Sequence, residues 1–139
     1  MRIPIPAVVI PVLVILLYLF LPGVKEQPWP PLRVAGAALV VIGYILLITA
    51  RIQLGKSFAV TAQAKALVTR GLYSRFRNPI YLSVDIMWFG LILVLHLYWL
   101  FVPLFALIVL HVFRARREAQ ILQDAFGQSY IDYQQRTWF

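Results

Sequence analysis

Asp85 and His111 are the first two residues of this chain that could do chemistry. Asp85 is the one carboxylate inside an apolar stretch, where a charge is costly in lipid, so we expect it to face a bundle interior and to have a partner. If the stretches 79–95 and 100–113 form an antiparallel hairpin, residues at equal depth have numbers that sum to about 195. This rule places His111 opposite Asp85. The pair could be a structural hydrogen bond between helices, or it could contact a substrate and act as a base.

Glu118 also allows two interpretations. It follows Arg114 by four residues, which is the spacing of an ion pair on a solvated helix. The same hairpin rule, however, places Glu118 opposite Asn78, at the start of an Asn-Pro turn. The second interpretation predicts a polar pocket at the membrane surface.

Aromatic residues accompany these polar groups: Tyr73, Phe76, Tyr81, Tyr130 and Tyr133. Tyrosines at a membrane edge commonly anchor a protein in the interface. The electron-rich face of an aromatic ring can also hold a sulfonium or ammonium group. The chain has no cysteine and only two histidines, so no metal site is expected. It also lacks the pattern of a glycine-rich phosphate loop.

The composition is that of an integral membrane protein. Of the 139 residues, 62% are hydrophobic, compared with about 45–50% in soluble domains. We expect an all-α membrane protein formed as a single domain over residues 1–139. The net charge of +8 is interpreted as a signal of membrane topology and contact with membrane lipids, and no nucleic-acid partner is expected.

The hydrophobic pattern predicts about four transmembrane helices, which must position the residues named above. They are expected over 3–21, 32–52, 79–95 and 100–113, followed by a cytosolic helix over 114–125. The third and fourth spans form the antiparallel hairpin. The first is expected to be retained, since no small-x-small cleavage site follows it.

Charge and small residues add two further expectations. Of the 13 Lys and Arg residues, only Lys25 and Arg33 fall on one side of the expected membrane, so both termini are expected to be cytosolic. The membrane would be a bacterial inner membrane or one of the endoplasmic-reticulum type. Gly36 and Gly43 in the second span favour close helix packing and could support a homodimer.

Several motifs resemble those of a known family. They are residues 54–58 (Leu-Gly-Lys-Ser-Phe), 67–73 (Leu-Val-Thr-Arg-Gly-Leu-Tyr), 77–81 (Arg-Asn-Pro-Ile-Tyr), Glu118, Leu122, Phe126-Gly127, Tyr130 and Tyr133. Their order and spacing over about residues 50–135 resemble the integral-membrane methyltransferases of the isoprenylcysteine carboxyl methyltransferase and phospholipid N-methyltransferase superfamily. The chain departs from the family pattern at four positions: Leu72, Asn78, Ser83 and Ala119, where Pro, His, Gly and a second Glu are frequent.

The resemblance implies methyl transfer from S-adenosylmethionine to a lipophilic or lipid-linked acceptor at the cytosolic face. The acceptor atom stays open between nitrogen, sulfur and a carboxyl oxygen. The implied donor-binding residues are Gly55, Lys56, Ser57, Gly71, Tyr73, Arg77, Asn78, Pro79, Tyr81 and Glu118.

The resemblance also implies roles for individual residues. Glu118 would hold the donor's ammonium or ribose, and Arg77 and Asn78 its carboxylate. Tyr73 and Tyr81 would flank the sulfonium or the adenine. Asp85 or His111, deeper in the bundle, would contact the acceptor or act as a base.

Three alternatives remain at this stage. One is a relative with the same helical core that uses a nicotinamide, although such reductases have more spans than this chain. Another is a small transporter or channel in which Asp85 carries the coupled proton or ion. The third is a non-catalytic membrane scaffold, which Ala119 in place of a second Glu keeps open.

Overall fold

The computed structural model describes residues 29–55 and 67–138, and this part of the chain is all-helical, as predicted. The expected first span, 3–21, lies outside the described residues, as do Lys56 and Ser57. The elements are α2 (Pro31–Leu54), the 3-10 turn η2 (Gly71–Ser74), α3 (Pro79–Leu95), the 3-10 turn η3 (Tyr98–Leu100), α4 (Phe101–Phe126) and α5 (Gln128–Arg136).

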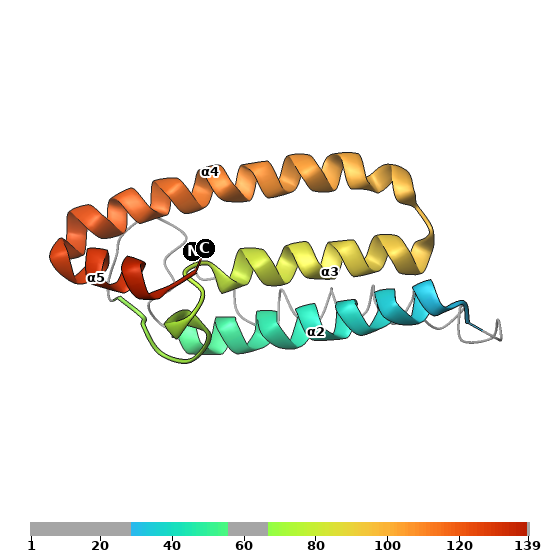
Figure 1. Ribbon diagram of the computed structural model, residues 1–139, viewed down its shortest axis with the longest axis horizontal. Helices are drawn as coiled ribbons and strands as arrows, with labels where there is room; N and C mark the ends of the chain where they lie inside the picture. The colour runs from blue at the N-terminus through green and yellow to red at the C-terminus, as the bar shows by residue number, and fades with distance from the viewer. Residues whose placement is uncertain (1–28, 56–66, 139) are drawn as a thin grey trace.

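Three long helices lie side by side, with α3 between α2 and α4 (Figure 1). After α3, His96 takes a left-handed conformation with φ 56°, and η3 leads into α4, which runs back along α3. At the far end, Gly127 has φ 53° and ends α4, as the sequence predicts. The short helix α5 then folds back toward the segment that precedes α3, so that this segment lies beside one end of the helices.

The contact between α2 and α3 depends on glycine. A Cβ atom on Gly90 would lie 2.6 Å from the carbonyl oxygen of Gly36, and one on Gly36 would lie 2.7 Å from that of Gly90. The two backbones therefore touch, and the neighbouring Val40 and Ile92 are almost fully buried. The predicted close packing at Gly36 is confirmed within the chain. The expected homodimer stays a prediction.

The variant Gly90→Ala is expected to destabilise the fold by about 1–3 kcal/mol, because the added methyl group forces α2 and α3 apart. Thermal unfolding in detergent measures this loss. Ala38→Leu is the control, since Ala38 is exposed on α2 and its replacement leaves this contact intact. Equal unfolding temperatures for the two variants would show that the close approach does not limit stability.

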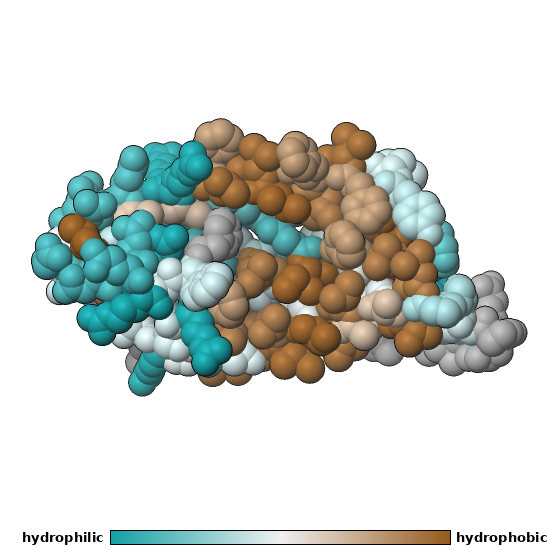
Figure 2. All heavy atoms as spheres, in the orientation of Figure 1, coloured by the Kyte–Doolittle hydropathy of each residue, from teal (hydrophilic) through white to brown (hydrophobic). Residues whose placement is uncertain are grey.

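The helices differ in whether they are long enough to cross the apolar core of a membrane. Both α2 and the segment Tyr98–Phe126 are long and apolar enough to cross a membrane. The apolar helix α3 has 17 residues, or about 25 Å. Figure 2 shows apolar side chains over the middle of these helices and polar ones around α5.

Candidate functional site

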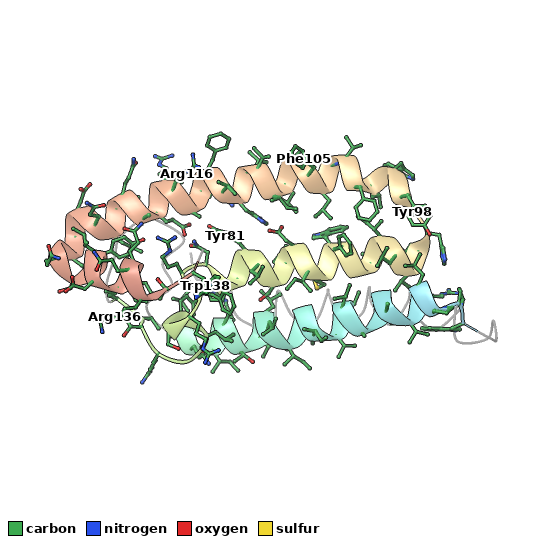
Figure 3. All side chains as sticks on the ribbon, in the orientation of Figure 1. Tyr81, Tyr98, Phe105, Arg116, Arg136 and Trp138 are labelled. Atoms are coloured by element: carbon green, nitrogen blue, oxygen red, sulfur yellow. The ribbon has the colours of Figure 1, made fainter. Side chains whose placement is uncertain are left out.

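The polar and aromatic residues at one end of the helices form a connected cluster. The hydroxyl of Tyr81, on the first turn of α3, donates a hydrogen bond of 2.5 Å to Oε1 of Glu118 on α4. On the same side of α3, the Tyr81 ring stacks on His111 with 4.7 Å between ring centroids and 21° between planes. Figure 3 shows Tyr81 between α3 and α4, at the end where Trp138 and Arg136 lie and away from Tyr98. Glu118 therefore faces α3, as the hairpin rule predicts.

Asp85 and His111 lie next to this cluster, one turn further along α3. His111 Nδ1 is 2.8 Å from Asp85 Oδ1, so the predicted contact is present. Both side chains are largely shielded, with exposed fractions of 10% for His111 and 16% for Asp85. An ionised carboxylate only accepts hydrogen bonds, so with Asp85 ionised the donor of this hydrogen bond is the Nδ1–H of His111.

The segment before α3 is fixed by α2. The Gln53 side chain, near the end of α2, accepts a hydrogen bond of 2.7 Å from the Leu72 backbone N–H. Gly71 has φ 63°, a conformation that favours glycine, and a Cβ there would meet the end of the Gln53 side chain. These contacts begin η2 and bury Tyr73, which is 6% exposed.

The C-terminal residues hold the same segment from the other side. The Tyr133 hydroxyl donates a hydrogen bond of 2.6 Å to the Tyr73 carbonyl. Further along, Trp138 N–H donates to the Arg75 carbonyl at 2.6 Å, and Arg77 N–H donates to the Trp138 carbonyl at 3.0 Å. The backbone of Arg77 is thus held by Trp138, which follows α5.

Burial and charge set the electrostatics of this end. Burial raises the pKa of Tyr73 well above its ordinary value, and it raises the pKa of Tyr133 to about 12, with neighbouring Tyr130 adding to the effect. Burial also raises the pKa of Tyr130, against the lowering effect of the Arg77 guanidinium. Within the described residues, Nε of Arg77 is buried and has no hydrogen-bond partner. An anion at this position would satisfy it.

The buried tyrosines predict a loss of stability in alkali. Below pH 10 they are protonated in both the folded and the unfolded chain, so their raised pKa values have no effect. Between pH 10 and about 12 the unfolded tyrosines ionise first, and the free energy of unfolding falls by at most about 1.4 kcal/mol per pH unit for each tyrosine. Thermal unfolding across this range measures the fall, and Tyr133→Phe should make it shallower. An unchanged slope in that variant would contradict the assignment.

The structure brings most, but not all, of the predicted residues together. Tyr73, Arg77, Tyr81 and Glu118 meet in one cluster with Asp85 and His111 beside it. The backbones of Gly71, Asn78 and Pro79, and not their side chains, help to form the local structure of this site. The Asn78 carbonyl accepts from Leu82 N–H and the Pro79 carbonyl from the Ser83 hydroxyl, while the Asn78 side chain does not cap α3. Gly55 ends α2 with φ 48° and is exposed, and no atom of the described residues lies near its Cβ position.

The sequence left part of the site unassigned. For Tyr130 and Tyr133 the sequence predicted either interface anchoring or contact with a cationic group. In the structure they are buried, at 2% and 8% exposure, and support Tyr73 and Arg77. Gln53 and Trp138 were missed. Their contacts are made through backbone groups of a distant segment, and residue type alone gives no signal for such contacts.

Comparison with known proteins gives consistent results. A model of the phospholipid methyltransferase family matches residues 32–129. The chain is 33% identical over 136 residues to a protein-S-isoprenylcysteine O-methyltransferase of Tribolium castaneum, covering 85% of this chain and 43% of that protein. It is 32% identical over 125 residues to protein-S-isoprenylcysteine O-methyltransferase B of Arabidopsis thaliana, covering 85% of this chain and 62% of that protein. The chain therefore spans about half the length of these relatives.

Proposed function

Because the chain belongs to the phospholipid methyltransferase family, we propose that it transfers a methyl group from S-adenosylmethionine to a lipophilic acceptor at the cytosolic face of a membrane. The observation that carries this proposal is the hydrogen bond from Tyr81 to Glu118 at the end of the helices where Arg77 also lies, whose Nε is buried without a hydrogen-bond partner among the described residues. The cluster combines a carboxylate, a guanidinium and aromatic rings at one end of an apolar bundle.

The residues of the cluster fit the donor. When bound, S-adenosylmethionine supplies a methyl group on a positively charged sulfur. Its amino-acid part carries an ammonium group, which suits Glu118, and a carboxylate, which suits the Nε–H of Arg77, a donor without a partner in the described part of the chain. The faces of Tyr81 and Tyr73 suit the positive sulfur or the adenine. The side chain of Asn78 would add a donor to the same carboxylate.

The surrounding helices would keep the reaction dry and admit the acceptor. Within the described chain, α4 buries only Leu104, His111 and Ala115, so it packs more loosely on α3 than α2 does. Figure 2 shows a hollow between α3 and α4 on the face in view. We propose that an apolar acceptor enters from this side and reaches Asp85 and His111. Exclusion of water strengthens the electrostatic contacts at the donor.

We further propose four spans over 3–21, 32–52, 79–95 and 100–113, with the last two as an antiparallel hairpin and the cytosolic helix continuing α4. The support is the distribution of charge. Seven arginines of the described chain lie on the loop before α3, on the second half of α4 and on α5: Arg70, Arg75, Arg77, Arg114, Arg116, Arg117 and Arg136. Because positive residues are retained on the cytosolic side, we propose that this end and both termini face the cytosol.

Two measurements on the purified full chain test the proposal. Calorimetry is expected to show binding of S-adenosylmethionine, and incubation with methyl-labelled donor and a total lipid extract should move the label into the lipid fraction. Binding without lipid labelling would restrict the proposal to the donor site and direct the search to other lipophilic acceptors. A chain that does not bind the donor at all would refute the proposal and favour the transporter or the scaffold.

A further inference from the structure

We infer that the hollow between α3 and α4 holds the apolar chain of the acceptor, and that a ring contact between Phe89 and Phe101 limits the length of that chain to about ten bonds. The inference rests on the proposed function and specifies the shape of its acceptor. It holds whichever atom of the acceptor receives the methyl group.

The burial of side chains along one face of α4 shows where the hollow lies. The side chains of Leu104, Ile108, His111 and Ala115 follow one another at intervals of three or four residues, so they share one face of the helix. His111 contacts α3, so this face is turned toward α3. Three of the four are buried, whereas Ile108, between them, is 37% exposed. At about the same depth on α3, Trp88 is 41% exposed. This face of α4 is therefore covered at both ends and open in its middle.

Aromatic side chains close the hollow at the end near the turn. The rings of Phe89 on α3 and Phe101 on α4 are in tilted contact, with 5.3 Å between their centroids. The ring of Tyr98, in η3, stacks on that of Phe101 with 6.5 Å between centroids. An apolar chain that lies along the helices from the other end meets this contact and cannot pass between α3 and α4 beyond it.

The polar cluster lies at the opposite end of the hollow. There the hydroxyl of Tyr81 is bound to Glu118, and its ring stacks on His111. Because we assign the donor to this cluster, the head of the acceptor must reach the same end. From Phe101 to Leu110, α4 carries only apolar side chains, which suit a hydrocarbon chain that extends away from the cluster.

The length of the hollow follows from helix geometry. Phe89 follows Tyr81 by eight residues, and at a rise of about 1.5 Å per residue the two lie about 12 Å apart along α3. An extended chain advances roughly 1.2 Å per bond, since three bonds of an extended backbone span about 3.3–3.6 Å. The hollow thus accommodates about ten bonds. The rest of a longer chain must turn out into the lipid, which is as apolar as the protein, so it adds no affinity.

A reporter thiol tests whether the hollow accepts an alkyl chain. The sequence contains no cysteine, so Ile108→Cys and Val109→Cys each introduce a single thiol. Both residues are 37% exposed, but successive residues of a helix point about 100° apart, so Val109 is turned away from the hollow. Both thiols should react with a lipid-soluble maleimide. An alkyl compound at about ten times its Kd should slow the reaction about tenfold at position 108 and leave it unchanged at position 109.

The length limit is measured with saturated alkyl compounds of about four to about sixteen carbons, each length made with an amine, a thiol and a carboxylate head. In the wild-type chain, kcat/KM for methylation should rise with length up to about ten bonds and then stay constant. Protection of the thiol in Ile108→Cys should follow the same profile. This second measurement does not require that any of the three heads is methylated.

Two variants should move the limit in opposite directions. Phe89→Ala removes one ring of the closure, so kcat/KM should exceed that of the wild type by up to about fourfold for each of the next two or three carbons. Ile108→Trp fills the hollow and should lower kcat/KM for the ten-carbon compound about tenfold, while the four-carbon compound reacts nearly as before. The ratio of variant to wild type at each length cancels the partitioning of the compound into detergent.

Val109→Trp is the matched control for Ile108→Trp, because it adds the same ring to an equally exposed position on another face of α4. It should leave the profile unchanged at every length. Donor affinity by calorimetry should stay within about twofold in all three variants, since none of these residues belongs to the polar cluster. This measurement also shows that the variants are folded.

Two results would overturn the inference and leave the proposed function intact. One is a thiol at position 108 that no alkyl compound protects, or that fails to react while the one at position 109 reacts, as expected if another part of the chain fills the hollow. The other is one common length profile in the wild type, Phe89→Ala and Ile108→Trp, all of which bind the donor. Absence of donor binding in the wild-type chain would instead refute the proposed function, and protection at position 108 would still decide whether the hollow holds an alkyl chain.

Discussion

Replacement of Glu118 by glutamine is expected to weaken binding of S-adenosylmethionine about 10–100-fold, or about 1.4–2.7 kcal/mol. Glu118 is exposed enough to reach a ligand, and in the described chain its carboxylate accepts a hydrogen bond from the Tyr81 hydroxyl at 2.5 Å. Glutamine keeps an oxygen for that hydrogen bond but loses the charge that an ammonium group requires. Calorimetric titration of the variant with the donor measures the change.

The control for this variant is Asp124→Asn. Asp124 is also on α4, is also exposed and lies beyond the cluster, so its replacement should leave donor affinity unchanged. A second variant, Tyr81→Phe, removes the hydroxyl that orients the Glu118 carboxylate but leaves its charge. We expect it to lower donor affinity less than Glu118→Gln does. Wild-type affinity in Glu118→Gln would show that the donor is held elsewhere.

Replacement of Arg77 by lysine is expected to lower donor affinity by about tenfold or more, although the charge is retained. A lysine ammonium cannot reproduce the forked guanidinium, of which Nε is buried and partnerless in the described chain. The backbone of Arg77 is held by the Trp138 carbonyl, so a change of side chain should not move the segment. Calorimetry with S-adenosylmethionine measures the loss.

Arg75→Lys provides the matched control, since Arg75 is two residues earlier, exposed and equally charged. A second observable comes from Tyr130, whose pKa the Arg77 guanidinium lowers. In Arg77→Met the pKa of Tyr130 should therefore rise, and a spectrophotometric tyrosine titration records this shift. If Arg75→Lys and Arg77→Lys weakened donor binding equally, the loss would not reflect a specific contact between the Arg77 guanidinium and the donor.

The sequence predicts well what depends on local chemistry. The bounds of α3 follow from Pro79 at its first turn and from the end of the apolar run. Gly127 marks the end of α4 because few other residues adopt its conformation easily. The contact between Asp85 and His111 follows from counting along two helices joined by a short turn. Each of these depends on residue type and spacing alone.

What the sequence does not predict depends on how distant segments meet. Helix α5 was not expected, because Gln128–Arg136 is polar and short, and isolated helices of this length are marginal in water. Its stability comes from burying Tyr130 and Tyr133 against the segment before α3. Gln53 was missed for the same reason, since its partner is a backbone N–H 19 residues away. The number of spans and the homodimer stay predictions.

The hydrogen bonds from Tyr133 and Trp138 to the segment before α3 set an order of assembly. Tyr133 and Tyr73 are separated by 60 residues. The hydrogen bond from the Tyr133 hydroxyl to the Tyr73 carbonyl can therefore form only after the later helices have been synthesised. The packing of α2 on α3 needs none of the C-terminal residues and is available earlier. A nascent chain would therefore first form a pair of packed helices, and the cluster around Tyr73 and Arg77 would be completed only when α5 and Trp138 fold back onto it.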